Sequence, residues 1–209
     1  MKSLLSLLLA TVATQASAED ESYVYKTHVC SEENYQGVCH EFHDAVPSLS
    51  NYDLDNTISS FKATGVWNFY DEPDYESAKL TTIGINIKTK LLTGELNNKI
   101  SSLRYAGSQT KFNEAGYNLY EGLLFTKKDF YGTIDIPDLS QYLQRVESII
   151  IIGQSYWTFC EEANYSGRCV CLKAKHHDWN LQKRLDTGLY GFILSEGIYN
   201  VTSVKKGCT

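Results

Sequence analysis

Two six-residue segments of one pattern hold the oxygen-rich chemistry of this chain. Residues 55–60 read DNTISS, and residues 97–102 read NNKISS. Each has two Asx residues, a free position, isoleucine and two serines, which places short oxygen-bearing side chains on a turn ahead of a strand. Calcium is bound by about six to eight oxygens from carboxylates, carbonyls, hydroxyls and water. Two such turns facing each other therefore predict shared calcium sites, while a pair of ordinary Asx and serine turns is the competing interpretation.

The start of the chain predicts export from the cell. Residues 1–18 combine Lys2, an apolar core at 4–9 and the small-residue cleavage site ASA at 16–18, which is typical of a secretory signal peptide. No later apolar run reaches the length of about eighteen residues that a membrane-spanning helix needs. We therefore expect a secreted, extracellular protein with no integral membrane segment. The net charge of −6 makes nucleic acid and anionic membranes poor partners.

Six cysteines in an oxidising compartment predict disulfides. Two cysteine pairs have the same spacing and bracket similar text, CSEENYQGVC and CEEANYSGRC. These hairpins are expected to be closed by their own disulfides, which leaves the last two cysteines to pair. The expected bonds are Cys30–Cys39, Cys160–Cys169 and Cys171–Cys208. The alternative is a metal site built from Cys169, Cys171, His176 and His177.

A repeat predicts the fold class. Residues 29–37, 69–77, 124–132 and 159–167 share an ending in which an Asx residue precedes an aromatic residue. The aromatic residues are Tyr35, Tyr75, Phe130 and Tyr165. A following glycine favours a positive φ in a folded-over hairpin, and Ser77 departs from that rule. Each hairpin precedes a segment that ends in serine, at 55–60, 97–102, 143–148 and 198–203. A strand, a hairpin, a turn and a return strand make a Greek key of about forty residues, so we expect an all-β protein.

Pairing the repeats predicts two domains, at residues 22–106 and 111–208, joined by a small polar linker. Trp67 and Trp157 stand two residues before Phe69 and Phe159, at the same place in the second repeat of each domain. This agreement indicates a duplication.

The hairpins and the serine-ended segments resemble the βγ-crystallin family over nearly all of the mature chain. The resemblance implies one β-sandwich of two Greek keys per domain. It also implies that each calcium takes a backbone carbonyl from one loop and a serine hydroxyl from the other. Thr57 and Lys99 would supply the carbonyls, and Ser59 and Ser101 the hydroxyls. The full implied metal site is Asp55, Asn56, Thr57, Ser59, Asn97, Asn98, Lys99 and Ser101, with Glu32, Asp71 and Glu72 of the facing hairpins as further candidates.

The second domain departs from this pattern. Leu143-Gln144 and Ile198-Tyr199 replace the Asx pairs, and Arg145 brings a positive charge, so we expect no calcium at these loops. The fourth repeat also carries an insertion at 168–190, containing the sequence HHDW, which we expect to be a surface loop. Such a loop is either simply solvated or binds a metal or a partner, such as an extracellular protein or glycan.

The spacings of common catalytic motifs are missing. We find no nucleophile elbow, no HExxH motif and no phosphate-binding glycine loop with lysine, so no catalytic residue is assigned and we expect no enzyme. Two interpretations follow. The first is a monomeric calcium-binding protein whose ion stabilises the N-terminal domain. The alternative is a recognition or defence protein, such as a protease inhibitor, toxin component or lectin-like binder, that acts through the insertion. The glycosylation sequons at Asn164 and Asn200 fall in a tight hairpin and a strand entry.

Overall fold

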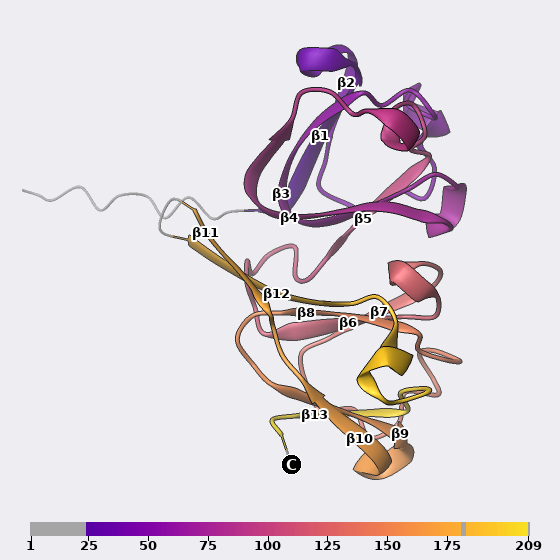
Figure 1. The fold of residues 1–209 in the computed structure, drawn as a ribbon, viewed down its shortest axis with the longest axis vertical. Helices are drawn as coiled ribbons and strands as arrows, with labels where there is room; N and C mark the ends of the chain where they lie inside the picture. Colours follow the sequence, from indigo (N-terminus) through magenta and orange to yellow (C-terminus); the bar gives the residue numbers. More distant parts are fainter. Residues whose placement is uncertain (1–23, 181–182, 209) are drawn as a thin grey trace, which may run out of the picture.

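The computed structural model describes residues 24–180 and 183–208, so the predicted signal peptide at 1–18 lies outside the described residues. Figure 1 shows two β-sheet halves stacked along the long axis, with the N-terminal half above the C-terminal half. The described residues form β-strands and short 3₁₀ turns and contain no α-helix, which confirms the all-β prediction.

In the N-terminal half, five strands form one continuous sheet. They are β1 (Lys26–Glu32), β2 (Gln36–Phe42), β3 (Ser60–Tyr70), β4 (Ala78–Thr89) and β5 (Ser102–Ala106). The order is β2-β1-β3-β4, and β5 also pairs with β3. The first part of the long β3 pairs with β1, and its last part pairs with β5. One strand therefore links two Greek keys without a break.

The β3–β4 hairpin bends where two glycines pair. Gly65 lies opposite Gly84, and both have positive φ, at 104° and 144°. The ring of Tyr25 lies against Gly65, where an added Cβ would come within 2.2 Å of a ring carbon. Only glycine combines this backbone conformation with so close an approach.

The C-terminal half contains two separate sheets. Its strands are β6 (Gly116–Tyr120), β7 (Asp129–Gly132), β8 (Ser148–Ile152), β9 (Trp157–Glu162), β10 (Ser166–Leu172), β11 (His176–Asn180), β12 (Lys183–Tyr190) and β13 (Ser203–Lys206). The sheets run β11-β12-β8-β6-β7 and β10-β9-β13. All connected strands are antiparallel, and together they bear out the Greek key β-sandwich class.

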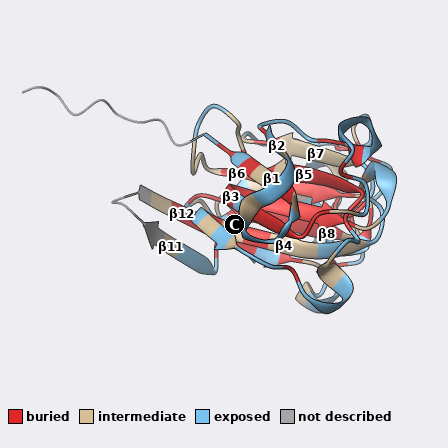
Figure 2. Ribbon diagram, turned by 90° about the horizontal axis from the view of Figure 1, so that it is seen from above, coloured by how far each residue is buried: buried red, intermediate tan, exposed pale blue. Residues whose placement is uncertain are grey.

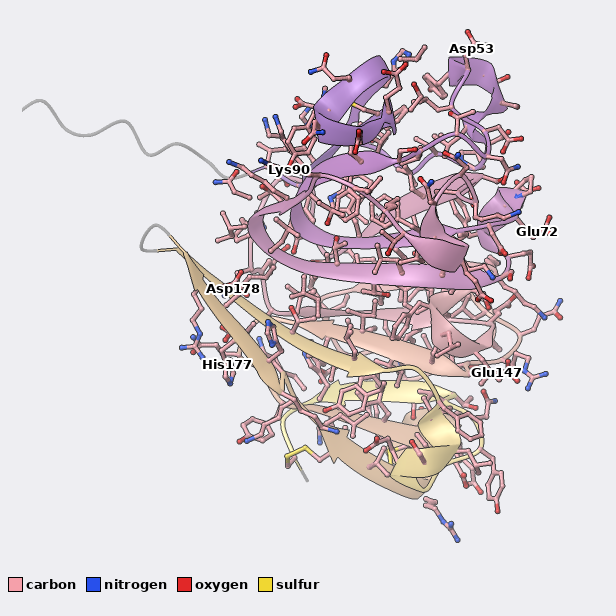
Figure 3. The ribbon with its side chains drawn as sticks, turned by 45° about the horizontal axis from the view of Figure 1, so that its top comes forward. Asp53, Glu72, Lys90, Glu147, His177 and Asp178 are labelled. Atoms are coloured by element: carbon pink, nitrogen blue, oxygen red, sulfur yellow. A yellow bond between two sulfur atoms is a disulfide. The ribbon has the colours of Figure 1, made fainter. Side chains whose placement is uncertain are left out.

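The expected surface loop of the insertion is instead a β-hairpin. Strand β12 pairs with β8, and β11 pairs with β12 at the edge of the same sheet. The hairpin reaches the other half, where the backbone N–H of Ile85 on β4 donates to Asp178 Oδ2 at 3.2 Å. Figure 3 shows Asp178 where the hairpin meets the N-terminal half. Pairing with β8, a strand far away in the chain, explains the difference, since β-strand hydrogen bonds satisfy a backbone that a loop would leave to water.

Buried side chains form three clusters. One lies inside each half, around Trp67 and around Trp157, and a third lies between the halves around Tyr25, Tyr120 and Ile150. Figure 2 shows the buried residues concentrated in the stacked strands, with exposed residues in the outer turns. The structure also contains the three expected disulfides, Cys30–Cys39, Cys160–Cys169 and Cys171–Cys208. Because Cys169 and Cys171 are disulfide-bonded, the alternative cysteine and histidine metal site is not formed.

Four short 3₁₀ turns repeat the same hairpin. They are η1 (Glu33–Tyr35), η3 (Pro73–Tyr75), η5 (Leu123–Phe125) and η6 (Ala163–Tyr165). In each, the backbone N–H of the aromatic residue donates to a serine hydroxyl at about 3 Å, and the four serines are Ser60, Ser102, Ser148 and Ser203. The remaining turns are η2 (Leu49–Tyr52), η4 (Gly94–Leu96) and η7 (Ile193–Glu196).

The third hairpin was placed wrongly by sequence. Its aromatic residue is Phe125, whereas the sequence pattern predicted Phe130, which lies on β7. The third hairpin lacks both signature residues, because Leu124 takes the Asx position and Lys127 takes the glycine position. Both nevertheless have positive φ, at 52° and 65°. Ser77 also keeps a positive φ of 52°, so the second hairpin has the same shape as the others.

Candidate metal centre

The loops at 55–60 and 97–102 lie against each other. The backbone N–H of Asn56 donates to the carbonyl of Ile100 at 2.9 Å, and that of Asn98 donates to the carbonyl of Ile58 at 3.0 Å. Asn56 and Asn98 both have left-handed backbone, with φ of 51° and 55°. Asparagine tolerates this conformation better than most residues. The reciprocal hydrogen bonds give the two loops an approximate two-fold relation.

The two serines of each loop have separate roles. Ser60 and Ser102 are committed to the hairpins, since each also donates to a hairpin carbonyl, that of Glu32 at 2.6 Å and that of Glu72 at 2.7 Å. Ser59 and Ser101 precede them and are buried. The hydroxyl of Ser59 crosses to the opposite loop and donates to Asn98 Oδ1 at 3.0 Å. This contact joins a serine hydroxyl of one loop to the other loop.

Three oxygen atoms of these loops and their facing hairpin are buried without a hydrogen-bond partner. They are Thr57 Oγ1, Asn97 Oδ1 and Asp71 Oδ1. Buried polar atoms in native proteins are normally partnered, so each such atom requires an explanation. Hard oxygen donors of this kind are what calcium binds. By their chemistry these oxygens fit calcium, and Ser59, Ser101 and the backbone carbonyls of the same two loops offer further oxygens.

Asp71 brings a negative charge to this region. Its backbone neighbour Tyr70 accepts a hydrogen bond from the N–H of Ser101 at 2.8 Å, which places Asp71 next to the second loop. Burial raises the pKa of Asp71, but hydrogen bonds from Lys79 and Ser77 outweigh it and hold that pKa below its ordinary value. Asp71 Oδ2 pairs with Lys79 Nζ at 2.8 Å, which leaves Oδ1 as the unpartnered oxygen.

The other sequence candidates lie at the margin. The side chains of Asp55 and Lys99 belong to exposed residues of the loop turns. Glu32 and Glu72 are exposed, and their carbonyls are used by Ser60 and Ser102. Figure 3 shows Glu72 at the rim of the N-terminal half. Among the described residues, no hydrogen bond links the side chains of these four residues to the buried oxygens.

The corresponding loops of the C-terminal half are built differently. Leu143 and Ile198 are buried in the core. The N–H of Gln144 donates to Glu121 Oε1 at 2.7 Å, and the N–H of Tyr199 donates to Glu161 Oε1 at 2.8 Å. Arg145 forms an ion pair with Glu147. Glutamate carboxylates therefore accept the two loop N–H groups that carbonyls of the facing loop accept in the N-terminal half.

Sequence reasoning missed Arg104, which anchors the second loop to the other half. Arg104 is 2% exposed, and its guanidinium donates to the carbonyls of Phe125 and Lys127, both at 2.6 Å, and to Asp129 at 3.1 Å. Tyr70, Tyr75 and Tyr120 place their rings within 5.3 Å of it. An arginine two residues after a serine pair gives no sequence signal for this role.

Comparison with known proteins identifies a family for the N-terminal half. The model of the beta/gamma crystallin family matches residues 26–106, the region that holds both calcium-type loops. Residues 26–106 are therefore identified as a beta/gamma crystallin region of the chain. The fold of the chain is similar to that of Geodin, a beta-gamma crystallin from Geodia cydonium, with a TM-score of 0.65 and 17% identity over 88% of this chain and 100% of that chain.

Two further solved structures match parts of this chain. One is a betagamma-crystallin from an archaeon, with 21% identity over 40% of this chain and 100% of that chain and a TM-score of 0.35. The other is protein S complexed with calcium, with 17% identity over 88% of this chain and 100% of that chain and a TM-score of 0.33. No curated protein sequence matches this chain. Within residues 24–180 and 183–208, no helix has the length and apolarity to cross a membrane.

Proposed function

We propose that this crystallin is a secreted, non-enzymatic protein that binds calcium through the loops at 55–60 and 97–102. The observation that carries the proposal is the set of buried, unpartnered oxygens on Thr57, Asn97 and Asp71. A bound calcium ion would give these oxygens the positive partner that the protein does not supply. We also propose that residues 22–106 and 111–208 act as separate domains, with calcium bound by the first.

The ion would mainly stabilise the N-terminal domain. The loops lead into β3 and β5, and their last serines, Ser60 and Ser102, accept hydrogen bonds from η1 and η3. An ion shared by both loops would therefore hold four elements together. By mass action, calcium at 100 times its dissociation constant adds about 2.7 kcal/mol per site to the free energy of unfolding. Extracellular calcium-binding modules typically have dissociation constants of about 10⁻⁴ to 10⁻³ M, so a weak site is sufficient.

Titration calorimetry on the oxidised protein tests this proposal. We expect about two calcium-binding events, and none in the double variant Ser59→Arg/Ser101→Arg, because each guanidinium would occupy the place of an oxygen ligand. Thr202→Arg is the matched control, since Thr202 holds in the fourth Greek key the position that Ser101 holds in the second. It should bind like wild type. An absence of heat in wild type, together with a melting temperature that chelator does not change, would reduce the loops to structural turns.

A further inference from the structure

The third hairpin differs from the other three at a residue that faces solvent. The second residue of each 3₁₀ turn has left-handed backbone, with φ of 56° at Asn34, 56° at Asp74, 52° at Leu124 and 56° at Asn164. Asparagine and aspartate tolerate this conformation, whereas in leucine the Cβ crowds the following carbonyl oxygen. Leu124 is also 58% exposed. Both the backbone and the surrounding water therefore disfavour leucine at this position.

The same hairpin carries unpaired positive charge. Lys127 stands at the third left-handed position of the hairpin, where the first and fourth hairpins have Gly37 and Gly167. Lys127 and Lys128 are both exposed. In the described part of the chain neither lysine forms an ion pair, whereas Arg145 pairs with Glu147.

Further apolar side chains gather beside Leu124. Its backbone N–H donates to the carbonyl of Gly191 at 2.9 Å, which brings η5 next to the segment leading into η7. Figure 1 shows both turns on the same side of the C-terminal half. Leu123, Phe192 and Leu194 are 44%, 48% and 42% exposed. We name the set Leu123, Leu124, Phe192 and Leu194 the apolar patch.

The N-terminal half provides the internal comparison. There the N–H of Asn34 donates to the carbonyl of Lys90 at 2.7 Å, in the same way as Leu124 does to Gly191. Glu33 and Asn34 take the places of Leu123 and Leu124, and Thr93 takes the place of Leu194. Of the four patch positions, only that of Phe192 stays apolar, as Leu91, which is 48% exposed. The patch is therefore a local feature of one hairpin, not a property of the fold.

We propose that the apolar patch and Lys127 and Lys128 form a docking surface for an anionic lipid membrane. Apolar side chains that enter the headgroup region, flanked by lysines that face anionic lipid, are the two signals that interfacial binding combines. The net charge of −6 opposes such binding at long range. Salt screens charges beyond a Debye length of about 8–10 Å, so acidic residues far from the patch weaken contact little. This surface is separate from the calcium loops.

Vesicle co-sedimentation tests the proposal on the full oxidised chain without residues 1–18, in chelator. The vesicles contain phosphatidylcholine alone or mixed with phosphatidylserine. We expect binding to the mixed vesicles that falls with added salt and exceeds binding to pure phosphatidylcholine. The triple variant Leu123→Glu/Leu124→Asn/Lys127→Gly copies the first hairpin into the third. It should bind at least about tenfold more weakly and melt at an equal or higher temperature.

Leu91→Asn is the matched control, because it removes an equally exposed apolar side chain at the position equivalent to Phe192. It should bind vesicles like wild type. Failure of wild type to bind mixed vesicles, or equal binding by the folded triple variant, would overturn the proposal. A concentration-dependent dimer that the triple variant loses, without vesicle binding, would also overturn it and assign the patch to a second copy of the chain. Binding that requires calcium and disappears in Ser59→Arg/Ser101→Arg would place the contact at the calcium loops instead.

Discussion

The two pairs of Greek key loops in this protein differ in the groups that accept their backbone N–H hydrogen bonds. In the N-terminal half, the loop N–H groups of Asn56 and Asn98 bond to the facing loop, and side-chain oxygens are left buried without partners. In the C-terminal half, the equivalent N–H groups bond to the carboxylates of Glu121 and Glu161. In the C-terminal half, hairpin carboxylates therefore accept the loop N–H groups that carbonyls of the facing loop accept in the N-terminal half.

One position of the hairpin decides between these arrangements. Asp71 lies three residues before Asp74, as Glu121 and Glu161 lie three residues before Leu124 and Asn164. The glutamates reach the loop N–H within their own repeat, whereas Asp71, which is one methylene shorter, pairs with Lys79. The longer glutamate side chains therefore accompany a change of hydrogen-bond partner in the third and fourth repeats, and Ser31 holds the same position in the first repeat.

The largest expected effect comes from separating the two halves. Arg104→Met keeps most of the apolar stem but removes the hydrogen bonds to Phe125, Lys127 and Asp129. We expect a loss of about 2–4 kcal/mol in the free energy of unfolding and two calorimetric transitions in place of one. Lys111→Met is the control, because Lys111 forms an exposed ion pair with Glu114 and should cost about 1 kcal/mol or less. One unchanged transition in Arg104→Met would contradict the role of Arg104 as the link between the halves.

Calcium should then act on one half only. In Arg104→Met, we expect added calcium at 100 times its dissociation constant to raise the N-terminal transition by about 2.7 kcal/mol per site and to leave the C-terminal transition unchanged. Differential scanning calorimetry in calcium and in chelator measures both. A shift of both transitions, or of the C-terminal one alone, would contradict the comparison between the loop pairs.

The smallest expected effect is on stability in acid. The pKa of Asp71 is held below its ordinary value of 3.8. The ionised carboxylate therefore stabilises the fold above that value, and this contribution is lost as the pH falls through the lower folded pKa. In chelator, the stability gap between wild type and Asp71→Asn should be about 1 kcal/mol or less at neutral pH and should close in acid. Urea denaturation from pH 7 to pH 3 measures it, with the exposed Asp55→Asn as control. A gap that stays constant with pH would refute this sign.

The sequence predicted the repeated parts of the fold because each repeat contains a serine that makes the same pair of hydrogen bonds. Ser60, Ser102, Ser148 and Ser203 each accept the N–H of an aromatic residue and donate to a carbonyl of the hairpin. A hydroxyl does both at once, so serine persists and marks the loop. The cysteine spacing was informative for a similar reason, since Cys30 and Cys160 lie directly opposite Cys39 and Cys169 across a hairpin.

Other features had no local signal. Leu124 and Lys127 adopt left-handed backbone although neither residue type favours it, so the tertiary hydrogen bonds to Ser148 and Gly191 fix the hairpin. The pairing of β12 with β8 joins segments far apart in the chain, and no period within 168–190 identifies that partner. The burial of Arg104 likewise depends on carbonyls from the other half. The calcium ligands at the candidate metal centre stay predictions, because the same carbonyl and hydroxyl oxygens occur in many turns that bind no metal.

The bond between Cys171 and Cys208 has a mechanical consequence. Strand β13 ends at Lys206, two residues before Cys208, and its only strand partner among the described residues is β9. Tension applied to the chain beyond Cys208 would pass through the covalent bond into β10. The hydrogen bonds of β13 would carry little of that load, so the strand could not be unzipped from its end. Force would instead act in shear on the β9–β10 hairpin, which its own disulfide already closes.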